Sequence, residues 1–103
     1  MIGCTVDGDL SPVVKGTRGI KQIANRTGIG VVELTLDQPM APHEYSAQAT
    51  ISEPIIGDTT VTVQKTLNSG IAKITVKTFA AGVAADLDFD VTAMPYMMPY
   101  TQG

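Results

Sequence analysis

The sequence predicts an all-β protein, an antiparallel sandwich or barrel of six to eight strands. Three observations support this prediction. Apolar and polar residues alternate with a period of two, turn residues separate the alternating runs, and no stretch has a convincing helical period. Such alternation is typical of strands that bury one face, and short strands separated by Gly and Pro are typical of sandwiches and barrels.

The first 25 residues are less regular than the rest, and we expect an N-terminal arm or irregular segment over 1–25. Glycine and proline are frequent in "GDLSPVVKGTRG" at 8–19, which is typical of loops. Short strands are expected near 2–6 and 20–23.

Five clearer strands follow within a β-sandwich module that we place at 26–94. Each strand is expected to turn its apolar residues towards the core. These residues are Val32, Leu34 and Leu36; Tyr45, Ala47, Ala49 and Ile51; Val61 and Val63; Ile74 and Val76; and Leu87, Phe89 and Val91. Asn68, Ser69 and Gly70 form a compact turn signal, so 59–79 is predicted to be a hairpin.

Residues 95–103 are predicted to form an extended C-terminal tail of this single domain. Pro95 and Pro99 remove backbone donors that a central strand needs. The apolar tail residues either cap the open end of the sandwich or contact another chain, because Met and Tyr suit interfaces. The interface candidates are Tyr96, Met97, Met98 and Tyr100.

The amino-acid composition limits the classes of function to be considered. With no Trp, three Tyr and two Phe, the core is aliphatic and thin, so an oligomer is a natural source of further burial. A net charge of −3 with scattered basic residues does not favour nucleic-acid binding. No apolar run approaches ~18 residues, so we expect neither a membrane span nor a secretion signal. A single cysteine, Cys4, excludes an internal disulfide and a multi-cysteine zinc site.

Few residues are candidates for chemistry. Gly28 and Gly30 begin like a dinucleotide fingerprint, but Glu33 occupies the third glycine position and a strand follows, so a tight turn is predicted. His43 lies in a turn with no partner at a fixed spacing. Cys4 has no thiolate-stabilising neighbours in sequence, and is expected to be a small core or arm residue. The sequence therefore predicts no enzyme and no cofactor.

Asp86, Asp88 and Asp90 are weak candidates for a calcium site. On one strand face their carboxylates are ~6.5 to 7 Å apart, too far for all three to reach one ion unaided. We expect instead a solvated acidic stripe that opposes edge pairing. Lysines such as Lys73 and Lys77, or a neighbouring subunit, are candidates to neutralise it.

A family resemblance is carried by "RTGIGVVELTLDQPMAPHEYSAQATIS" at 26–52 and "ITVKTFAAGVAADLDFDVTAMPY" at 74–96. These segments resemble the small β-sandwich module of virion proteins of tailed bacteriophages. In that module a Thr-Gly-x-Gly turn opens a strand, a Pro-containing turn precedes a strand beginning near Tyr, and a late segment with Phe, Gly and Asp closes the fold. The matching positions are Thr27, Gly28, Gly30, Pro39, Tyr45, Phe79, Gly82, Asp86, Asp88, Phe89 and Val91.

The resemblance covers about 26–96 and implies an antiparallel jelly-roll-like β-sandwich, similar to the trimers of the tumour-necrosis-factor and complement type. Two positions depart from it. Val31 or Val32 replaces an aromatic residue after the glycine, and Leu87 stands where a second late Phe is usual. The alternation is preserved, so the packing is expected to hold.

The function that the resemblance implies is a virion structural protein without catalysis. We expect a capsid decoration or cement protein, a minor capsid component made in the host cytoplasm and located on the capsid surface. It would act as a homotrimer that bridges subunits of the major capsid protein. The alternative is a fibre-knob, head-fibre or tail-associated module that binds a host receptor. The short segment before the module favours capsid attachment, and no convergent polar set favours a ligand-binding domain or an enzyme subunit.

Overall fold

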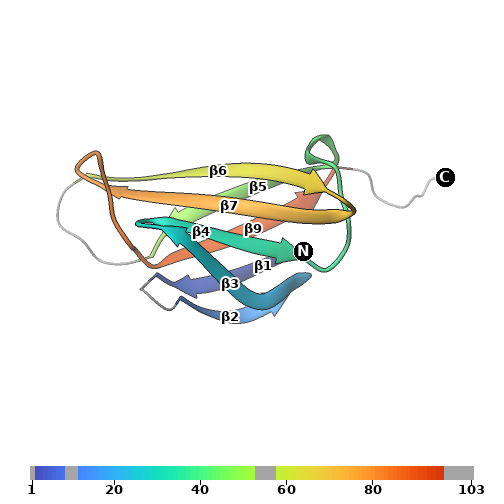
Figure 1. Ribbon diagram of the computed structural model, residues 1–103, viewed down its shortest axis with the longest axis horizontal. Helices are drawn as coiled ribbons and strands as arrows, with labels where there is room; N and C mark the ends of the chain where they lie inside the picture. The colour runs from blue at the N-terminus through green and yellow to red at the C-terminus, as the bar shows by residue number, and fades with distance from the viewer. Residues whose placement is uncertain (1, 9–11, 53–57, 97–103) are drawn as a thin grey trace.

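The computed structural model describes residues 2–8, 12–52 and 58–96, which form two facing antiparallel sheets (Figure 1). The nine strands and one 3₁₀ turn of the described residues are β1 (Ile2–Asp7), β2 (Val13–Arg18), β3 (Ile20–Gly28), β4 (Val31–Leu36), η1 (Pro42–Glu44), β5 (Tyr45–Ile51), β6 (Thr59–Asn68), β7 (Ile71–Ala80), β8 (Val83–Ala84) and β9 (Phe89–Pro95). The predicted antiparallel β-sandwich is confirmed. The two-residue β8 takes the count one strand above the predicted range.

Hydrogen bonding orders the strands β2-β1-β9-β5 in sheet 1 and β3-β4-β7-β6 in sheet 2, with β8 paired to the end of β7. Four connections are hairpins within one sheet: β1 to β2, β3 to β4, β6 to β7, and β7 to β8. The first and last strands pair in the middle of sheet 1, with Cys4 opposite Val91. Segments far apart in sequence therefore share one sheet.

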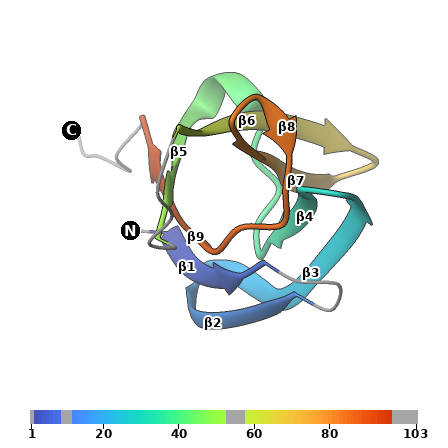
Figure 2. The same cartoon turned by 90° about the vertical axis from the view of Figure 1, so that its left-hand side faces the viewer.

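The edge strands of the two sheets meet along two seams (Figure 2). At the β2/β3 seam, the Gln22 amide donates a hydrogen bond to the Val14 carbonyl at 3.4 Å. At the β5/β6 seam, Lys65 Nζ donates to the Tyr45 carbonyl at 2.6 Å. In each case a side chain from sheet 2 satisfies a backbone acceptor on the edge of sheet 1, which protects an edge that is otherwise open to pairing.

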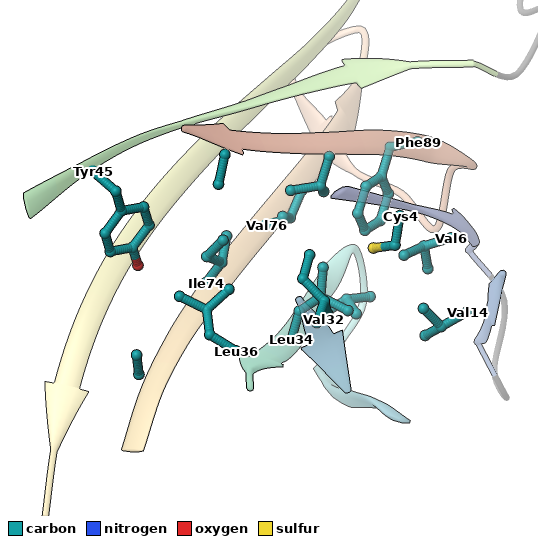
Figure 3. Packing of buried hydrophobic residues seen from close by; sticks show 14 residues of the cluster. Cys4, Val6, Val14, Val32, Leu34, Leu36, Tyr45, Ile74, Val76 and Phe89 are labelled. Atoms are coloured by element: carbon teal, nitrogen blue, oxygen red, sulfur yellow. The ribbon is translucent and has the colours of Figure 1, made fainter. Parts of the chain in front are cut away.

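The core lies between the sheets and is mainly aliphatic (Figure 3). Every strand predicted by alternation turns its apolar side to this core, as the period of two requires. The buried apolar residues are Cys4, Val6, Val14, Ile20, Val32, Leu34, Leu36, Tyr45, Ala72, Ile74, Val76, Leu87, Phe89, Val91 and Ala93. Tyr45 and Phe89 are the largest fully buried side chains.

The predicted hairpin over 59–79 is confirmed. The strands β6 and β7 pair from Thr59 opposite Ala80 to Asn68 opposite Ile71. The two turn residues, Ser69 and Gly70, have φ of 53° and 75°. Positive φ at both central positions belongs to the two-residue turn whose twist matches the flanking strands.

The predicted arm or irregular segment over 1–25 is wrong, whereas the short strands predicted near 2–6 and 20–23 are present in β1 and β3. Residues 2–7, 13–18 and 20–25 are strands of the sandwich, which extends from Ile2 to Pro95 rather than over 26–94. The prediction fails because β2 contains a β-bulge. Gly3 pairs with Arg18 and Thr5 with Lys15, so Gly16 and Thr17 both oppose Cys4, and Gly16 has a φ of 60°. Glycines that are typical of loops serve here inside a strand.

Candidate functional site

The three aspartates near the end of the chain do not form the solvated stripe that the sequence predicts. Leu87, Phe89 and Val91 point into the core as expected, but the strand begins only at Phe89, so Asp86 and Asp88 lie in the preceding loop. Asp88 Oδ1 accepts a hydrogen bond from the Gly8 amide at 2.8 Å. Asp90, on β9, accepts one from the Thr5 hydroxyl at 2.8 Å.

Asp86 instead forms the least exposed ion pair of the described residues. Its carboxylate accepts from Arg26 Nε at 3.1 Å and Arg26 Nη2 at 2.9 Å, and also from the Gly30 amide at 2.7 Å. About a fifth of each charged side chain is exposed, at 22% and 20%. The hydrogen bond from Arg26 lowers the pKa of Asp86, burial opposes this effect, and the Gly30 amide adds to the lowering.

The expected role of Lys73 and Lys77 is also wrong. Both lie on β7 in sheet 2, whereas Asp90 is on β9 in sheet 1. Lys73 forms an ion pair with Glu33 at 3.6 Å. Within the described ranges, no group of three His, Cys, Asp or Glu side chains is placed to hold a metal ion. Asp86 and Asp88 serve as hydrogen-bond acceptors that fix loops, and Asp90 links β9 to β1.

The Gly28–Gly30 segment is the tight turn that the sequence predicts. It joins β3 to β4, and Gly30 has a φ of 70°. The Gly30 carbonyl accepts the Thr78 amide at 2.8 Å, and the buried Thr78 hydroxyl donates to the Ala85 carbonyl at 2.6 Å. Together with Asp86, these bonds clamp the turn to strand β7 and to the loop before β9. These hydrogen bonds account for the glycines of the turn, so the resemblance to a dinucleotide-binding fingerprint is not needed to explain them.

Cys4 and His43 do not form a catalytic pair. Cys4 is buried on β1, and its burial, with a smaller effect of the Asp90 charge, raises the pKa of its thiol to about 11. A thiol in this state is a poor nucleophile at neutral pH. His43 is exposed in η1, in the turn where the sequence places it.

The remaining residues of the family motif have structural places. Thr27 and Gly28 end β3, Pro39 is exposed before η1, and Gly82 has a φ of 79° in the turn between β7 and β8. Phe79 is half-buried on β7. Tyr45, Phe89 and Val91 are core residues.

Tyr45 combines a buried ring with an unpaired hydroxyl. Its side chain is fully buried, and its hydroxyl has no hydrogen-bond partner among the described residues. Burial raises the pKa of this phenol. Lys65 Nζ lies 5.1 Å from the ring centroid, so the ammonium that closes the β5/β6 seam also makes a cation–π contact.

Two large apolar side chains are exposed at the end of β9, one on the strand and one directly after it. Met94 is 53% exposed and Tyr96 is 60% exposed, and the Tyr96 amide donates to the Glu44 carbonyl at 2.9 Å. Beside Met94, Ser46, Gln48 and Thr92 line a shallow groove of about 280 Å³ on sheet 1. We call Met94, Tyr96 and this groove the β9 end surface. The other predicted interface residues, Met97, Met98 and Tyr100, lie outside the described residues.

Several residues with clear roles are absent from the sequence prediction. Arg26 has no local signal, because its partner Asp86 is 60 positions away. Lys65 stands at an inward position of an alternating strand, and that break in polarity is a signal that could have identified the seam contact. Met94 shares the outward parity of Thr92, which could have identified it as exposed.

Two further observations bear on function. In the part of the chain that the structure describes, no helix has the length and hydropathy of a membrane span. Known protein families, curated proteins and solved structures yield no match to this chain. The resemblance to phage virion modules stays a prediction.

Proposed function

We propose that the chain is a structural protein of a tailed-phage virion, a capsid decoration protein that forms a homotrimer and bridges major capsid subunits. Its action is docking, without a reaction step. The observation that carries this proposal is the β9 end surface, where Met94 and Tyr96 are exposed together. Monomeric proteins seldom leave large apolar side chains clustered on the surface unless they meet a partner.

The polar groups of the sandwich support a structural role. Asp86, Asp88 and Thr78 hold loops, and Lys65 closes a seam. The buried thiol of Cys4 is protonated at neutral pH. Side chains with potential chemistry are thus used to stiffen the fold, which suits a protein that transmits load between its neighbours.

The β9 end surface has the composition of a docking contact. Tyr offers a rigid apolar ring with a polar tip, and Met adapts to the shape of its partner. A trimer presents three copies of this surface, so weak contacts add up once the first subunit has bound. Three such contacts across a capsomer junction resist its opening under internal pressure.

The proposal is tested with phage particles made without this chain, to which purified chain is added back. We expect saturable binding at the head and greater resistance of the particles to heat. The double variant Met94→Ser, Tyr96→Ser should bind at least tenfold more weakly, because each side chain buries apolar area worth about 1–2 kcal/mol. Gel densitometry of pelleted particles measures occupancy.

Val83→Ser is the matched control. Val83 is an apolar side chain of comparable exposure, at 68%, and lies on β8 in sheet 2. It should bind as the original chain does. Equal binding by the double variant, or density for the chain on the tail in electron micrographs, contradicts the proposal.

The alternative, a fibre or receptor-binding module, has one observation in its favour. The outer face of sheet 2 carries a polar groove of about 580 Å³, lined by residues that include Gln64, Thr66, Lys73, Thr75 and Lys77. Amides, hydroxyls and ammonium groups suit a polar receptor. Location on the tail, with loss of host adsorption when the chain is absent, would favour this function.

A further inference from the structure

The β2/β3 seam exposes apolar side chains that the fold does not use. Val13 is 50% exposed and Ile23 is 70% exposed. Both line a shallow groove of about 380 Å³ together with Pro12 and Ala24. Ile20 and Ala24 face the core, so Ile23, which directly precedes Ala24, is turned outward. The pairing of β3 with β4 is irregular over this stretch, between Ile20 opposite Leu36 and Ala24 opposite Leu34.

The same surface is basic in an otherwise acidic protein. Residues 12–24 contain three of the seven basic residues and none of the ten acidic ones. Lys15 pairs with Asp7 at 3.2 Å. Arg18 and Lys21 are exposed and form no ion pair with another described residue. Acidic groups on a partner would complement Arg18 and Lys21.

The opposite side of the molecule, the β5/β6 seam, offers such groups. Glu44 and Asp58 are exposed at its two ends, directly before β5 and β6. The basic residue of this seam, Lys65, donates to the Tyr45 carbonyl within its own chain. Leu67, 37% exposed on β6, adds apolar area. The two seams are thus complementary in charge and lie on opposite sides of the sandwich (Figure 2).

Along the strands, Lys21 lies near the height of Glu44, whereas Arg18 does not. Arg18 pairs with Gly3, and Gly3 pairs with Thr92 near the end of β9. At the same end, Tyr45, which follows Glu44, pairs with Pro95. Thr92 in turn pairs with Gln48, so Arg18 lies four residues, or ~13 Å, from the height of Glu44. Lys21 lies in the irregular stretch opposite Thr35, which is level with Lys73 and Thr66 across sheet 2. Lys65, beside Thr66, contacts Tyr45, which follows Glu44, so a rotation about an axis parallel to the strands carries Lys21 of one copy towards Glu44 of the next.

We propose that a second copy of this chain docks on the β2/β3 seam with its β5/β6 seam, and that repetition of this head-to-tail contact closes a ring. Head-to-tail interfaces use two different surfaces on each subunit, and a closed rotation yields cyclic symmetry. Val13 and Ile23 are the apolar contacts, Lys21 faces Glu44, and Arg18 adds positive charge to the seam. The inference builds on the homotrimer of the proposed function, for which it names the interface.

The test is sedimentation velocity of the purified full-length chain at about 100 µM. We expect an oligomer, a trimer by the proposed function, that weakens as salt rises from 50 to 500 mM because exposed charges are screened. Arg18→Glu with Lys21→Glu should shift the chain to monomer, and so should Ile23→Ser. Because these side chains are exposed, far-UV circular dichroism should stay unchanged.

Charge exchange and a matched control sharpen the test. Adding Glu44→Lys to the Lys21→Glu chain should restore the oligomer, because the Lys21–Glu44 complementarity is rebuilt with opposite signs. Val83→Ser, which removes an equally exposed side chain outside both seams, should leave it intact. A monomeric original chain, or an oligomer unaffected by Ile23→Ser and by the charge reversal, overturns the inference. Neither result depends on capsid binding, which is measured separately on particles.

Discussion

At the scale of single residues, Asp86 is the charged side chain on which local structure depends most. It receives hydrogen bonds from Arg26 on β3 and from the Gly30 amide, and so fixes the turn before β4 to the loop before β9. A partly buried carboxylate with charge-assisted bonds contributes more than an exposed ion pair, because its partners are left unsatisfied when it is removed. Removal of the Asp86 carboxylate should therefore lower the free energy of unfolding.

We predict that Asp86→Asn lowers the free energy of unfolding by about 1–3 kcal/mol, the range for hydrogen bonds to charged groups. Urea denaturation followed by circular dichroism measures the change. Lys15→Met is the control, because it removes the exposed ion pair with Asp7 at 3.2 Å and should cost no more than about 0.5 kcal/mol. Similar losses in the two variants would contradict a special role for Asp86.

The contribution of Asp86 should also appear in the pH dependence of stability. Folding lowers the pKa of Asp86, so its stabilisation is fully present above the pKa of the unfolded chain, about 3.9, and is lost as the pH falls through the folded pKa. The original chain should therefore lose more stability than Asp86→Asn between pH 5 and pH 2. Parallel pH profiles for the two proteins would refute this part of the prediction.

At the scale of elements, the β3–β4 turn has the tightest backbone packing of the turns with positive φ. A Cβ on Gly30 would lie 2.6 Å from the Thr78 carbonyl oxygen and 2.8 Å from that of Ala85. Neither oxygen can move easily, because Thr78 belongs to β7 and both take part in the clamp. Gly70, with a φ of 75°, has no atom within 4 Å of its Cβ position.

This contrast gives a matched pair of variants. Both Gly30→Ala and Gly70→Ala place an alanine at positive φ, which costs about 1–2 kcal/mol. We predict that Gly70→Ala stops near that value, while Gly30→Ala costs more by about 1–3 kcal/mol because of the overlap with backbone. Chemical denaturation of both proteins gives the difference. Equal costs would mean that the clamp yields to the extra atom.

The elements differ in how far the sequence predicts them. Alternation alone places the strands around Leu34, Ile74 and Phe89, because each of them buries one face without interruption. It fails for β2, where Gly16 forms a bulge that has the same composition as a loop. It also places Asp86 in a strand, because alternation continues through the loop that the Arg26 contact holds in place.

At the scale of the whole molecule, what the sequence does not predict is mainly pairing. The neighbours of β9 are β1 and β5, and no local pattern specifies such partners. The two seams depend on the same long-range order, since Lys65 and Tyr45 meet only once both sheets are assembled. For this reason the candidate interface residues Val13 and Ile23, unlike Tyr96, become visible only in the folded chain.

The position of β1 distinguishes the sandwich most sharply from a module with an arm. An arm can be removed without loss of the fold, whereas β1 lies between β2 and β9 and brings Cys4 and Val6 into the core. We predict that deletion of residues 1–8 abolishes cooperative thermal unfolding, since β9 loses one neighbour and β2 loses its place in the sheet.

A chain ending at Tyr96 is the control for this deletion, because it keeps all nine strands and should unfold cooperatively near the temperature of the original chain.

Val6→Ala provides a graded form of the test. It removes methyl groups from a fully buried side chain and should cost about 2–3 kcal/mol, whereas Val13→Ala, at a half-exposed position on the neighbouring strand, should cost less than about 1 kcal/mol. Cooperative unfolding of the chain without residues 1–8 would show that β1 is a dispensable arm. Equal losses of stability in Val6→Ala and Val13→Ala would contradict the role of Val6 in the core.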